Sequence, residues 1–413
     1  MYFFPSYVTH YEKNGEINVT SGLRMNTIKL TDSQVMNEFR SIVNHGGCSE
    51  ICTELEHFLH EQDLLLSQQE ICAELQELRN AMNEALLVTM MPTEGCNFRC
   101  PYCYEDHTPN TMRRQTLDRI HEYIVRQAPE FKRINIAWFG GEPTLCKDTV
   151  LETSELLQSL QKKYGFQYTS SMTTNGYLLS KTSFLQYYNA GITSYQITLD
   201  GWDHDKTRPH VSGEGTLQTI LNNLQEISNL LPDEYNFNII LRYNILPDSV
   251  CDSWYDHLYE LFGKDERFSV LVRAVGNWGG ETVKSLNLLE GTELQTALNK
   301  HNAYLKKIGM KGWEEVVAPL SRICYASYPH SMVFRADGTI EKCTVALNHP
   351  KNRIGYVDAE LGVVLDESAN QQWSGIELKS ECFNCAKVLA CLNTQCPRAQ
   401  IIGGTGICDY GKD

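Results

Sequence analysis

The stretch Gly95-Cys96-Asn97-Phe98-Arg99-Cys100-Pro101-Tyr102-Cys103-Tyr104 is the most informative part of this sequence. It places three thiols on one short loop in a CxxxCxxC pattern. Three thiolates on one loop can hold three irons of a [4Fe-4S] cluster and leave the fourth iron without a protein ligand. A structural zinc site takes four ligands, but Cys146 is the only later cysteine within 50 residues. The loop therefore favours an iron–sulfur site with one open iron over zinc.

Six short apolar runs alternate with helical segments after residue 85. They lie at 86–90, 133–138, 168–173, 194–199, 237–243 and 268–272. This alternation predicts parallel βα units, because parallel neighbours need long crossovers. Such folds bind ligands at the carboxyl ends of their strands, and the three-cysteine loop directly follows the first strand. The sequence therefore predicts an α/β fold with its chemistry at that end of the sheet.

The composition argues against several classes of protein. The 413 residues carry 36 Lys and Arg against 51 Asp and Glu, which gives a net charge of −15, whereas nucleic-acid binding relies on a cationic surplus. The N-terminus lacks the basic and apolar regions of a signal peptide, and no apolar run approaches the roughly 18 residues of a membrane span. We expect a cytoplasmic protein with no nucleic-acid or membrane partner, whose 15 cysteines are reduced.

Seven more cysteines are clustered near the C-terminus. They are Cys324, Cys343, Cys382, Cys385, Cys391, Cys396 and Cys408. A single zinc site would not use seven cysteines, so a binuclear zinc site is the competitor of iron–sulfur clusters here. The five remaining cysteines, Cys48, Cys52, Cys72, Cys146 and Cys251, are scattered, and we expect them to be small buried apolar side chains.

The first 85 residues predict a small α+β domain. Two extended runs within 7–20 flank Asn14-Gly15, a strong hairpin signal, and a third run covers 25–30. Thr31 and Gln34 predict a capping box that opens a helix, which Gly46-Gly47 ends. Two more helices are predicted from apolar side chains at helical spacing: Ile51, Leu55, Phe58 and Leu59 for the second, and Ile71, Leu75, Leu78 and Met82 for the third.

The whole chain then divides into four predicted regions: 1–85, the α/β region 86–275, a bridging region 276–320 with a helix at about 292–307, and the cysteine-rich region 321–413. The last region is rich in turns and has little continuous apolar periodicity. Such a composition is typical of a segment that folds around metal.

The three-cysteine loop resembles the cluster-binding motif of the radical S-adenosylmethionine (radical SAM) enzymes. Their CxxxCxφC form is matched by Tyr102, whose ring the resemblance places beside the adenine of SAM. Gly140, Gly141 and Glu142, after the second strand, resemble the GGEP motif that meets the methionine amino group. Further matches end the third and fourth strands, where Asn175 and Thr198 are candidates for contacts with the SAM ribose and carboxylate. Arg208 and Arg242 are weaker carboxylate candidates, and turn formation is the alternative role of these short motifs.

Together, in this order, the motifs imply a partial (β/α)6 radical SAM barrel between a winged-helix-like N-terminal domain and a C-terminal cluster-binding domain. The C-terminal spacing resembles the SPASM extension with two auxiliary [4Fe-4S] clusters, so three clusters are expected in all. The resemblance implies one auxiliary cluster on Cys382, Cys385, Cys391 and Cys408, and an open one on Cys324, Cys343 and Cys396. Four residues rather than the usual three separate Cys391 from Cys396.

The N-terminal domain resembles the recognition element of enzymes that modify ribosomally made (RiPP) peptides, where the precursor's leader adds a strand to the small sheet. We therefore expect a peptide maturase whose SAM-derived 5'-deoxyadenosyl radical abstracts a hydrogen and which installs a Cys thioether, as in sactipeptides and ranthipeptides. An electron donor such as flavodoxin or ferredoxin is implied. The alternatives are a carbon–carbon crosslinking cyclase, a sulfatase-maturing type of enzyme, a packing role for the N-terminal domain, and a zinc-binding interaction protein.

Overall fold

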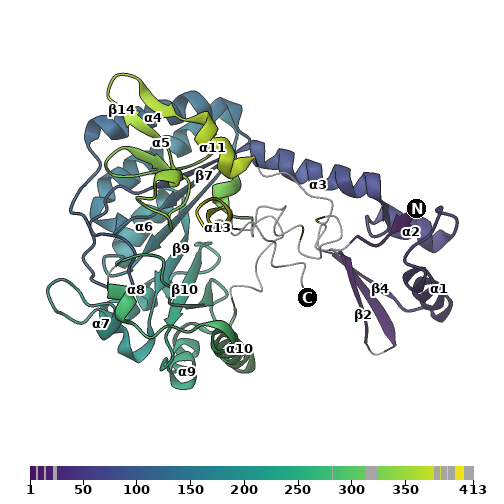
Figure 1. Cartoon of the computed structure of the whole chain (residues 1–413). Helices are drawn as coiled ribbons and strands as arrows, with labels where there is room; N and C mark the ends of the chain where they lie inside the picture. The colour runs from purple at the N-terminus through teal and green to yellow at the C-terminus, as the bar shows by residue number, and fades with distance from the viewer. Residues whose placement is uncertain are drawn as a thin grey trace. The chain divides into compact units, whose positions relative to one another are not determined.

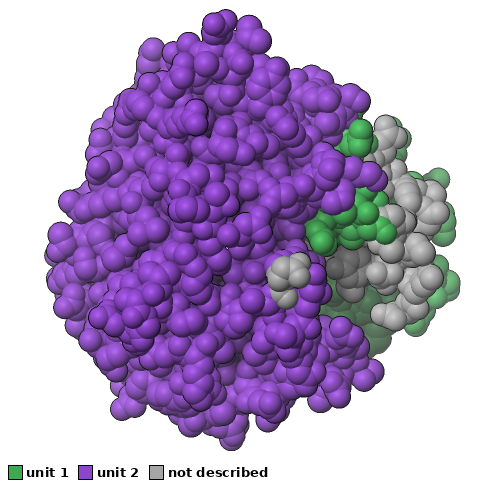
Figure 2. Space-filling view, turned by 60° about the vertical axis from the view of Figure 1, so that its left-hand side comes forward, with its two compact units in different colours: residues 1–84, 317–329, 371–413 green, residues 85–316, 330–370 purple. Residues whose placement is uncertain are grey.

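The computed structural model describes residues 1–5, 8–13, 15–21, 26–280, 282–312, 323–375, 382, 388 and 396–403. The chain divides into two compact units, which Figure 2 colours separately. The smaller unit comprises residues 1–84, 317–329 and 371–413, and the larger comprises 85–316 and 330–370. Residues 330–370 thus group with the α/β region, across the boundary expected near residue 321. The division into four regions with separate functions stays a prediction.

The larger unit is built on a ten-stranded sheet in the order β11-β10-β9-β8-β7-β6-β12-β13-β14-β15 (Figure 1). Its first six strands are parallel: β6 (Ala85–Met90), β7 (Arg133–Trp138), β8 (Gln167–Thr174), β9 (Ile192–Thr198), β10 (Asn238–Ile245) and β11 (Phe268–Ala274). These are the six strands expected from the sequence, and the α/β prediction is confirmed.

Helices connect consecutive strands of the parallel part: α4 (Arg114–Gln127), α5 (Lys147–Tyr164), α6 (Lys181–Asn189), α7 (His204–Thr207), α8 (Leu217–Ser228) and α9 (Asp252–Phe262). Each long helix buries an apolar stripe, such as Leu117, Ile120 and Ile124 of α4. After β11, α10 (Gly291–Ile308) confirms the helix expected at 292–307. None of the described helices is both long and apolar enough to cross a bilayer.

Four strands that the sequence did not predict continue the sheet beyond β6. β12 (Ser331–Phe334) pairs in parallel with β6. β13 (Thr339–Glu341), β14 (Arg353–Asp358) and β15 (Gly362–Leu365) then follow as an antiparallel meander. β6 therefore has hydrogen-bonded neighbours on both sides, β7 and β12.

The smaller unit contains three strands followed by three helices, as expected. β2 (Val8–Lys13), β3 (Glu16–Ser21) and β4 (Asn26–Leu30) form an antiparallel sheet, and α1 (Ser33–Asn44), α2 (Glu54–Glu61) and α3 (Gln68–Asn83) follow (Figure 1). A second sheet, which the sequence did not predict, pairs β1 (Tyr2–Phe3) with β5 (Leu66–Ser67). The short helix α13 (Pro397–Ile401) also belongs to this unit, whereas α11 (Glu367–Ser374) begins in the larger unit and ends in the smaller one.

Two local predictions in this unit are wrong. The cap of α1 is Asp32 and not Thr31, because the Asp32 carboxylate accepts hydrogen bonds from the amides of Gln34 and Val35 at 2.9 and 3.0 Å. A carboxylate at this position also interacts favourably with the helix dipole. The second helix begins only after a capping box of Thr53 and Glu56, so Ile51 precedes it. Its Phe58 is 41% exposed and lies off the buried face.

Candidate active site

The three-cysteine loop forms one wall of a cavity of about 290 Å³ at the carboxyl ends of the parallel strands. All nine residues that the sequence assigned to the radical SAM site line this cavity: Cys96, Cys100, Tyr102, Cys103, Gly140, Gly141, Glu142, Asn175 and Thr198. Arg208 and Arg242, the weaker candidates, line it as well. The fold thus brings the loops after β6, β7, β8 and β9 to one place, as their common end of the sheet requires.

Burial dominates the chemistry of the three thiols. It raises the pKa of Cys96 to about 12, with the charge of Glu142 as the next cause, and that of Cys103 to about 12, with Glu105 next. Burial also raises the pKa of Cys100, which Arg208 opposes. Thiolates are the metal-binding form of cysteine, and a bound metal group would supply positive charge that stabilises them. Three cavity-lining sulfurs fit a [4Fe-4S] cluster with one open iron.

A second wall of the cavity consists of Gly140 and Gly141, which lie directly against the loop that precedes Cys96. The amide of Gly141 donates to the carbonyl oxygen of Thr93 at 3.2 Å, and the amide of Glu142 donates to that of Gly95 at 3.0 Å. A Cβ on Gly140, which has φ 109°, would lie 2.5 Å from the Thr93 oxygen. A Cβ on Gly141 would collide with the Gly95 carbonyl oxygen. The two glycines therefore allow the end of β7 to brace the cysteine loop.

The Glu142 carboxylate is buried and accepts four hydrogen bonds from the protein. Its Oε1 accepts from the amide and hydroxyl of Thr144 at 3.1 and 2.6 Å and from the hydroxyl of Thr174 at 2.6 Å. Its Oε2 accepts from the amide of Asn175 at 2.7 Å. Burial raises the pKa of Glu142 although these donors oppose it. Because Oε2 has only one of these donors, it has room for a further donor from the cavity.

Tyr102 is fixed by a buried polar network. Its hydroxyl donates to the Asp200 carboxylate and accepts from the Arg208 guanidinium at 3.0 Å and from the Asn244 amide at 3.3 Å. Burial raises the pKa of Asp200, which the charge of Arg208 opposes. The Nε of Arg208 is itself buried without a hydrogen-bond partner among the described residues. This arrangement orients the tyrosine ring and leaves a cationic donor group at the cavity.

Several cavity residues were missed by the sequence analysis. Gln196 lies two residues before Thr198 on β9, and Asn244 lies two residues after Arg242 on β10, so each shares a face of its strand with a predicted residue. Because side chains alternate between the two faces of a strand, this two-residue spacing was the sequence signal that could have identified both residues. Trp278, which is half exposed, also lines the cavity and belongs to the connection after β11. In the same connection the Thr282 hydroxyl donates to the Pro101 carbonyl oxygen at 2.5 Å.

A comparison with protein-family models decides the identity of this region. The model of the radical SAM superfamily matches residues 90–250. Residues 90–250 are a radical SAM domain.

Curated relatives match part of the chain. The GTP 3',8-cyclase of Haemophilus ducreyi is 29% identical over 218 residues, which are 49% of this chain and 60% of that protein. The GTP 3',8-cyclase of Actinobacillus pleuropneumoniae serotype 5b is 33% identical over 131 residues, which are 31% of this chain and 36% of that protein. The chain therefore matches less than two thirds of the length of either relative.

Solved structures share the fold of the radical SAM domain and its surroundings. The structure of anSMEcpe with bound AdoMet and Cp18Cys peptide has a TM-score of 0.53 at 17% identity, over 75% of this chain and 88% of that one. SuiB of Streptococcus suis, bound to its precursor peptide SuiA, has a TM-score of 0.52 at 12% identity, over 95% of both chains. At these identities the likeness concerns the fold alone.

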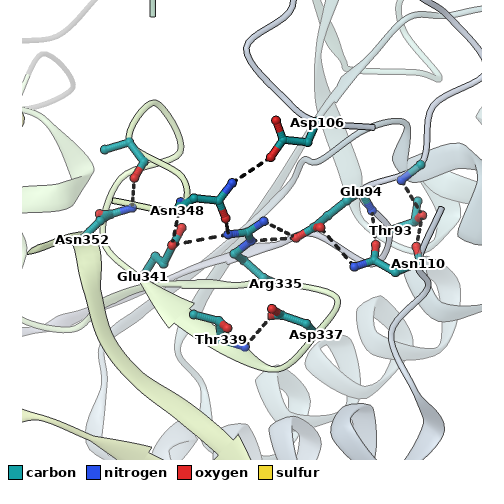
Figure 3. Close-up of polar contacts among 12 residues, drawn as sticks. Thr93, Glu94, Asp106, Asn110, Arg335, Asp337, Thr339, Glu341, Asn348 and Asn352 are labelled. Atoms are coloured by element: carbon teal, nitrogen blue, oxygen red, sulfur yellow. Dashed lines mark hydrogen bonds and ion pairs between the residues drawn. The ribbon is translucent and has the colours of Figure 1, made fainter. Parts of the chain in front are cut away.

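A polar network around Arg335 anchors the start of the cysteine loop of the radical SAM domain (Figure 3). Arg335 follows β12, and its guanidinium bonds to the Glu94 carboxylate through Nε at 2.7 Å and Nη2 at 2.6 Å. The other Glu94 oxygen accepts from the Asn110 amide at 3.0 Å. The contact between Arg335 and Glu94 spans 241 residues of sequence, so no local sequence pattern predicts it.

The predicted auxiliary ligands are described only in part. Cys343 is buried and follows β13 in the larger unit, whereas Cys324 belongs to the smaller unit, which also contains Cys382 and the exposed Cys396. Cys385, Cys391 and Cys408 lie outside the described residues. Among the described residues, no three Cys, His, Asp or Glu side chains are close enough to share a single metal ion. The ligands of a [4Fe-4S] cluster bind separate irons and need not converge in this way.

Proposed function

We propose that this chain is a radical SAM peptide maturase that links a cysteine sulfur of a ribosomally made precursor peptide to a carbon of the same peptide. The observation that carries the proposal is the convergence of all nine sequence-assigned site residues on one cavity. A peptide substrate is supported by the fold shared with anSMEcpe and SuiB, each of which is bound to a peptide in its solved structure. Thioether formation is the leading product, and a carbon–carbon crosslink is the second candidate.

The cavity residues have distinct tasks in this proposal. Cys96, Cys100 and Cys103 hold the cluster, while Gly140, Gly141 and the free capacity of Glu142 Oε2 receive the methionine amino group. Asn175 and Thr198 contact the ribose and carboxylate, for which the unpartnered Nε of Arg208 is a further donor. When bound, SAM and the cluster supply a 5'-deoxyadenosyl radical that abstracts a hydrogen from carbon. The protein orients these groups and keeps water away from them.

Two auxiliary [4Fe-4S] clusters complete the proposed cofactor set. We assign one to Cys382, Cys385, Cys391 and Cys408, and an open one to Cys324, Cys343 and Cys396. An open iron can bind the substrate thiolate, and the clusters can accept the electron that bond formation releases. The count of ten clustered cysteines, three, three and four, supports this division. We further propose a cytoplasmic location and a flavodoxin or ferredoxin as electron donor.

The N-terminal sheet is the proposed docking site for the leader of the precursor. β2 is an edge strand whose residues from Thr9 to Lys13 are exposed, and it pairs on one side with β3. An exposed edge presents unpaired backbone donors and acceptors to which an extended peptide can add as a strand. This geometry supports a recognition role over a packing role.

The proposal is tested with anaerobically reconstituted protein, SAM, dithionite and a cysteine-containing peptide encoded beside the gene. We expect 5'-deoxyadenosine together with a peptide that has lost two hydrogen atoms and one free thiol. A product that has lost two hydrogens but keeps its thiols would indicate a carbon–carbon link. A parallel incubation with GTP covers the activity of the curated relatives. Turnover of GTP without change in the peptide would refute the proposal, as would zinc without sulfide in the purified protein.

Deleting residues 1–84 should separate recognition from chemistry. We expect the shortened protein to form 5'-deoxyadenosine at the full-length rate in the absence of peptide, because the cavity lies in the larger unit. Its KM for the full precursor should rise by roughly tenfold to a hundredfold, since the strand-addition contacts are lost. The matched control is a leaderless core peptide, on which both proteins should act equally. Equal KM values for the full precursor would favour a sulfatase-maturing type of enzyme.

A further inference from the structure

Arg335 makes contacts that the proposed chemistry leaves unexplained. Only 9% of its side chain is exposed, yet its guanidinium is surrounded by the carboxylates of Glu94 and Glu341 and by the amide oxygen of Asn348. Nη1 lies 2.5 Å from the Asn348 Oδ1 and 3.5 Å from the nearer Glu341 oxygen, while Nε and Nη2 both bond to Glu94. A planar guanidinium can serve several acceptors in fixed directions, which the point charge of a lysine cannot.

These contacts reach both ends of the three-cysteine loop (Figure 3). Glu94 stands two residues before Cys96. On the other side, the Asn348 amide donates to the Asp106 carboxylate at 2.9 Å, and Asp106 stands three residues after Cys103. One side chain therefore links the entry of the loop directly, and its exit through Asn348, to the segment that follows β12.

The same contacts hold the segment that carries Cys343. Glu341 ends β13 two residues before Cys343, and Asn348 lies five residues after Cys343. The backbone amide of Asn348 also donates to the Glu341 carboxylate at 3.3 Å, and Asn348 has a left-handed φ of 65°. The turn after Cys343 is thus folded back onto Arg335. The guanidinium therefore connects this turn to the three-cysteine loop.

We propose that Arg335 is a positioning residue that fixes the three-cysteine loop relative to the Cys343 segment and supplies positive charge among the carboxylates that flank this loop. The proposal rests on the cluster site proposed at Cys96, Cys100 and Cys103. A cluster on three thiolates is anionic, and three carboxylates, Glu94, Asp106 and Glu341, lie along the Arg335 network. Removing the cation makes the addition of an electron less favourable. Loss of Arg335 should therefore lower the reduction potential as well as disturb the geometry.

The test compares Arg335→Met and Arg335→Lys with a matched control, Arg267→Met. Arg267 is equally buried, with 8% of its side chain exposed, and pairs with Asp265 just before β11, at the amino end of that strand and away from the cavity. The readouts on reconstituted full-length protein are iron content, the EPR spectrum of the reduced cluster with and without SAM, its midpoint potential, and the rate of 5'-deoxyadenosine formation without peptide.

We expect Arg335→Met to show a lower potential, a smaller SAM-induced change in the EPR spectrum and a rate reduced by roughly tenfold to a hundredfold. Arg335→Lys should restore the potential more than the rate, because it returns the charge but not the bridging geometry. Arg267→Met should match the wild type in spectrum and potential. Wild-type readouts from Arg335→Met would overturn the inference, whereas a wild-type protein that lacks a SAM-binding cluster would overturn the proposed function instead.

A milder variant keeps the inference testable if Arg335→Met fails to fold. Asn348→Gly removes the exposed side chain that reaches Asp106 and keeps a residue suited to the left-handed backbone. We expect full iron content with an intermediate loss of rate and of the SAM-induced EPR change. If Asn348→Gly has the wild-type spectrum and rate, the link to the exit of the loop is not functional and the inference fails.

Discussion

Replacing Cys96, Cys100 and Cys103 together with alanine is expected to reduce 5'-deoxyadenosine formation by about a thousandfold or more, to the background level. The three thiols line the cavity, and the proposed cluster has no other protein ligand, so the reaction loses the group that would deliver its electron. Rates are measured with dithionite and SAM in the absence of peptide, which keeps the result independent of the unknown precursor.

Iron content gives the second readout of the same variant. Three clusters correspond to about twelve irons per chain and two to about eight. The variant should therefore keep about two thirds of the wild-type iron and sulfide. Cys52→Ala is the control, because Cys52 belongs to the smaller unit and is exposed, so the burial expected for it from the sequence is wrong. A triple variant that still forms 5'-deoxyadenosine would show that the catalytic assignment is wrong.

Gly141→Ala is expected to have the largest effect of any single methyl group added at this site. The new Cβ would collide with the Gly95 carbonyl oxygen, and its next neighbour, the Glu94 oxygen, would be only 2.5 Å away. Both are backbone atoms, so no side-chain rotation relieves the clash, and the loop before Cys96 has to move. We expect a loss of stability of about 1–3 kcal/mol or more and a loss of most of the SAM-cleaving activity.

The matched control for this variant is Gly312→Ala, because a Cβ on Gly312 meets no atom within 4 Å. Thermal unfolding and iron content are compared for the two proteins after identical reconstitution. Gly312→Ala should resemble the wild type in both. If Gly141→Ala also binds iron and cleaves SAM like the wild type, the close approach of the two loops is not required.

The parallel part of the fold was predictable because each of its strands is a short apolar run between helices. β7 and β11 begin at the residues expected from the sequence. β12 to β15 were missed for a physical reason. They are short, and β12 is stabilised by pairing with β6, a partner more than 240 residues away, which no local periodicity reports.

The same distinction between local patterns and long-range contacts applies to the candidate site. Residues in contiguous motifs, such as Gly140 to Glu142, were found through their resemblance to a family motif, because one loop carries both the turn and the functional groups. Asp200, which accepts a hydrogen bond from the Tyr102 hydroxyl across 98 positions, was given no role from the sequence. Arg335 was not found at all. A side chain that acts through another residue leaves no motif, so only the folded chain identifies it.

The two neighbours of β6 also bear on the motions of the cavity. Local opening of a sheet begins where the fewest backbone hydrogen bonds must break. β6 is held by two ladders, whereas β11 has one ladder with β10 and, on its outer side, a single bridge to Gly312 among the described residues. We therefore expect the backbone amides of β6, next to the three-cysteine loop, to exchange with solvent more slowly than those of β11. The β11 side, whose connection continues to Trp278 at the cavity, is where we expect the sheet to open first.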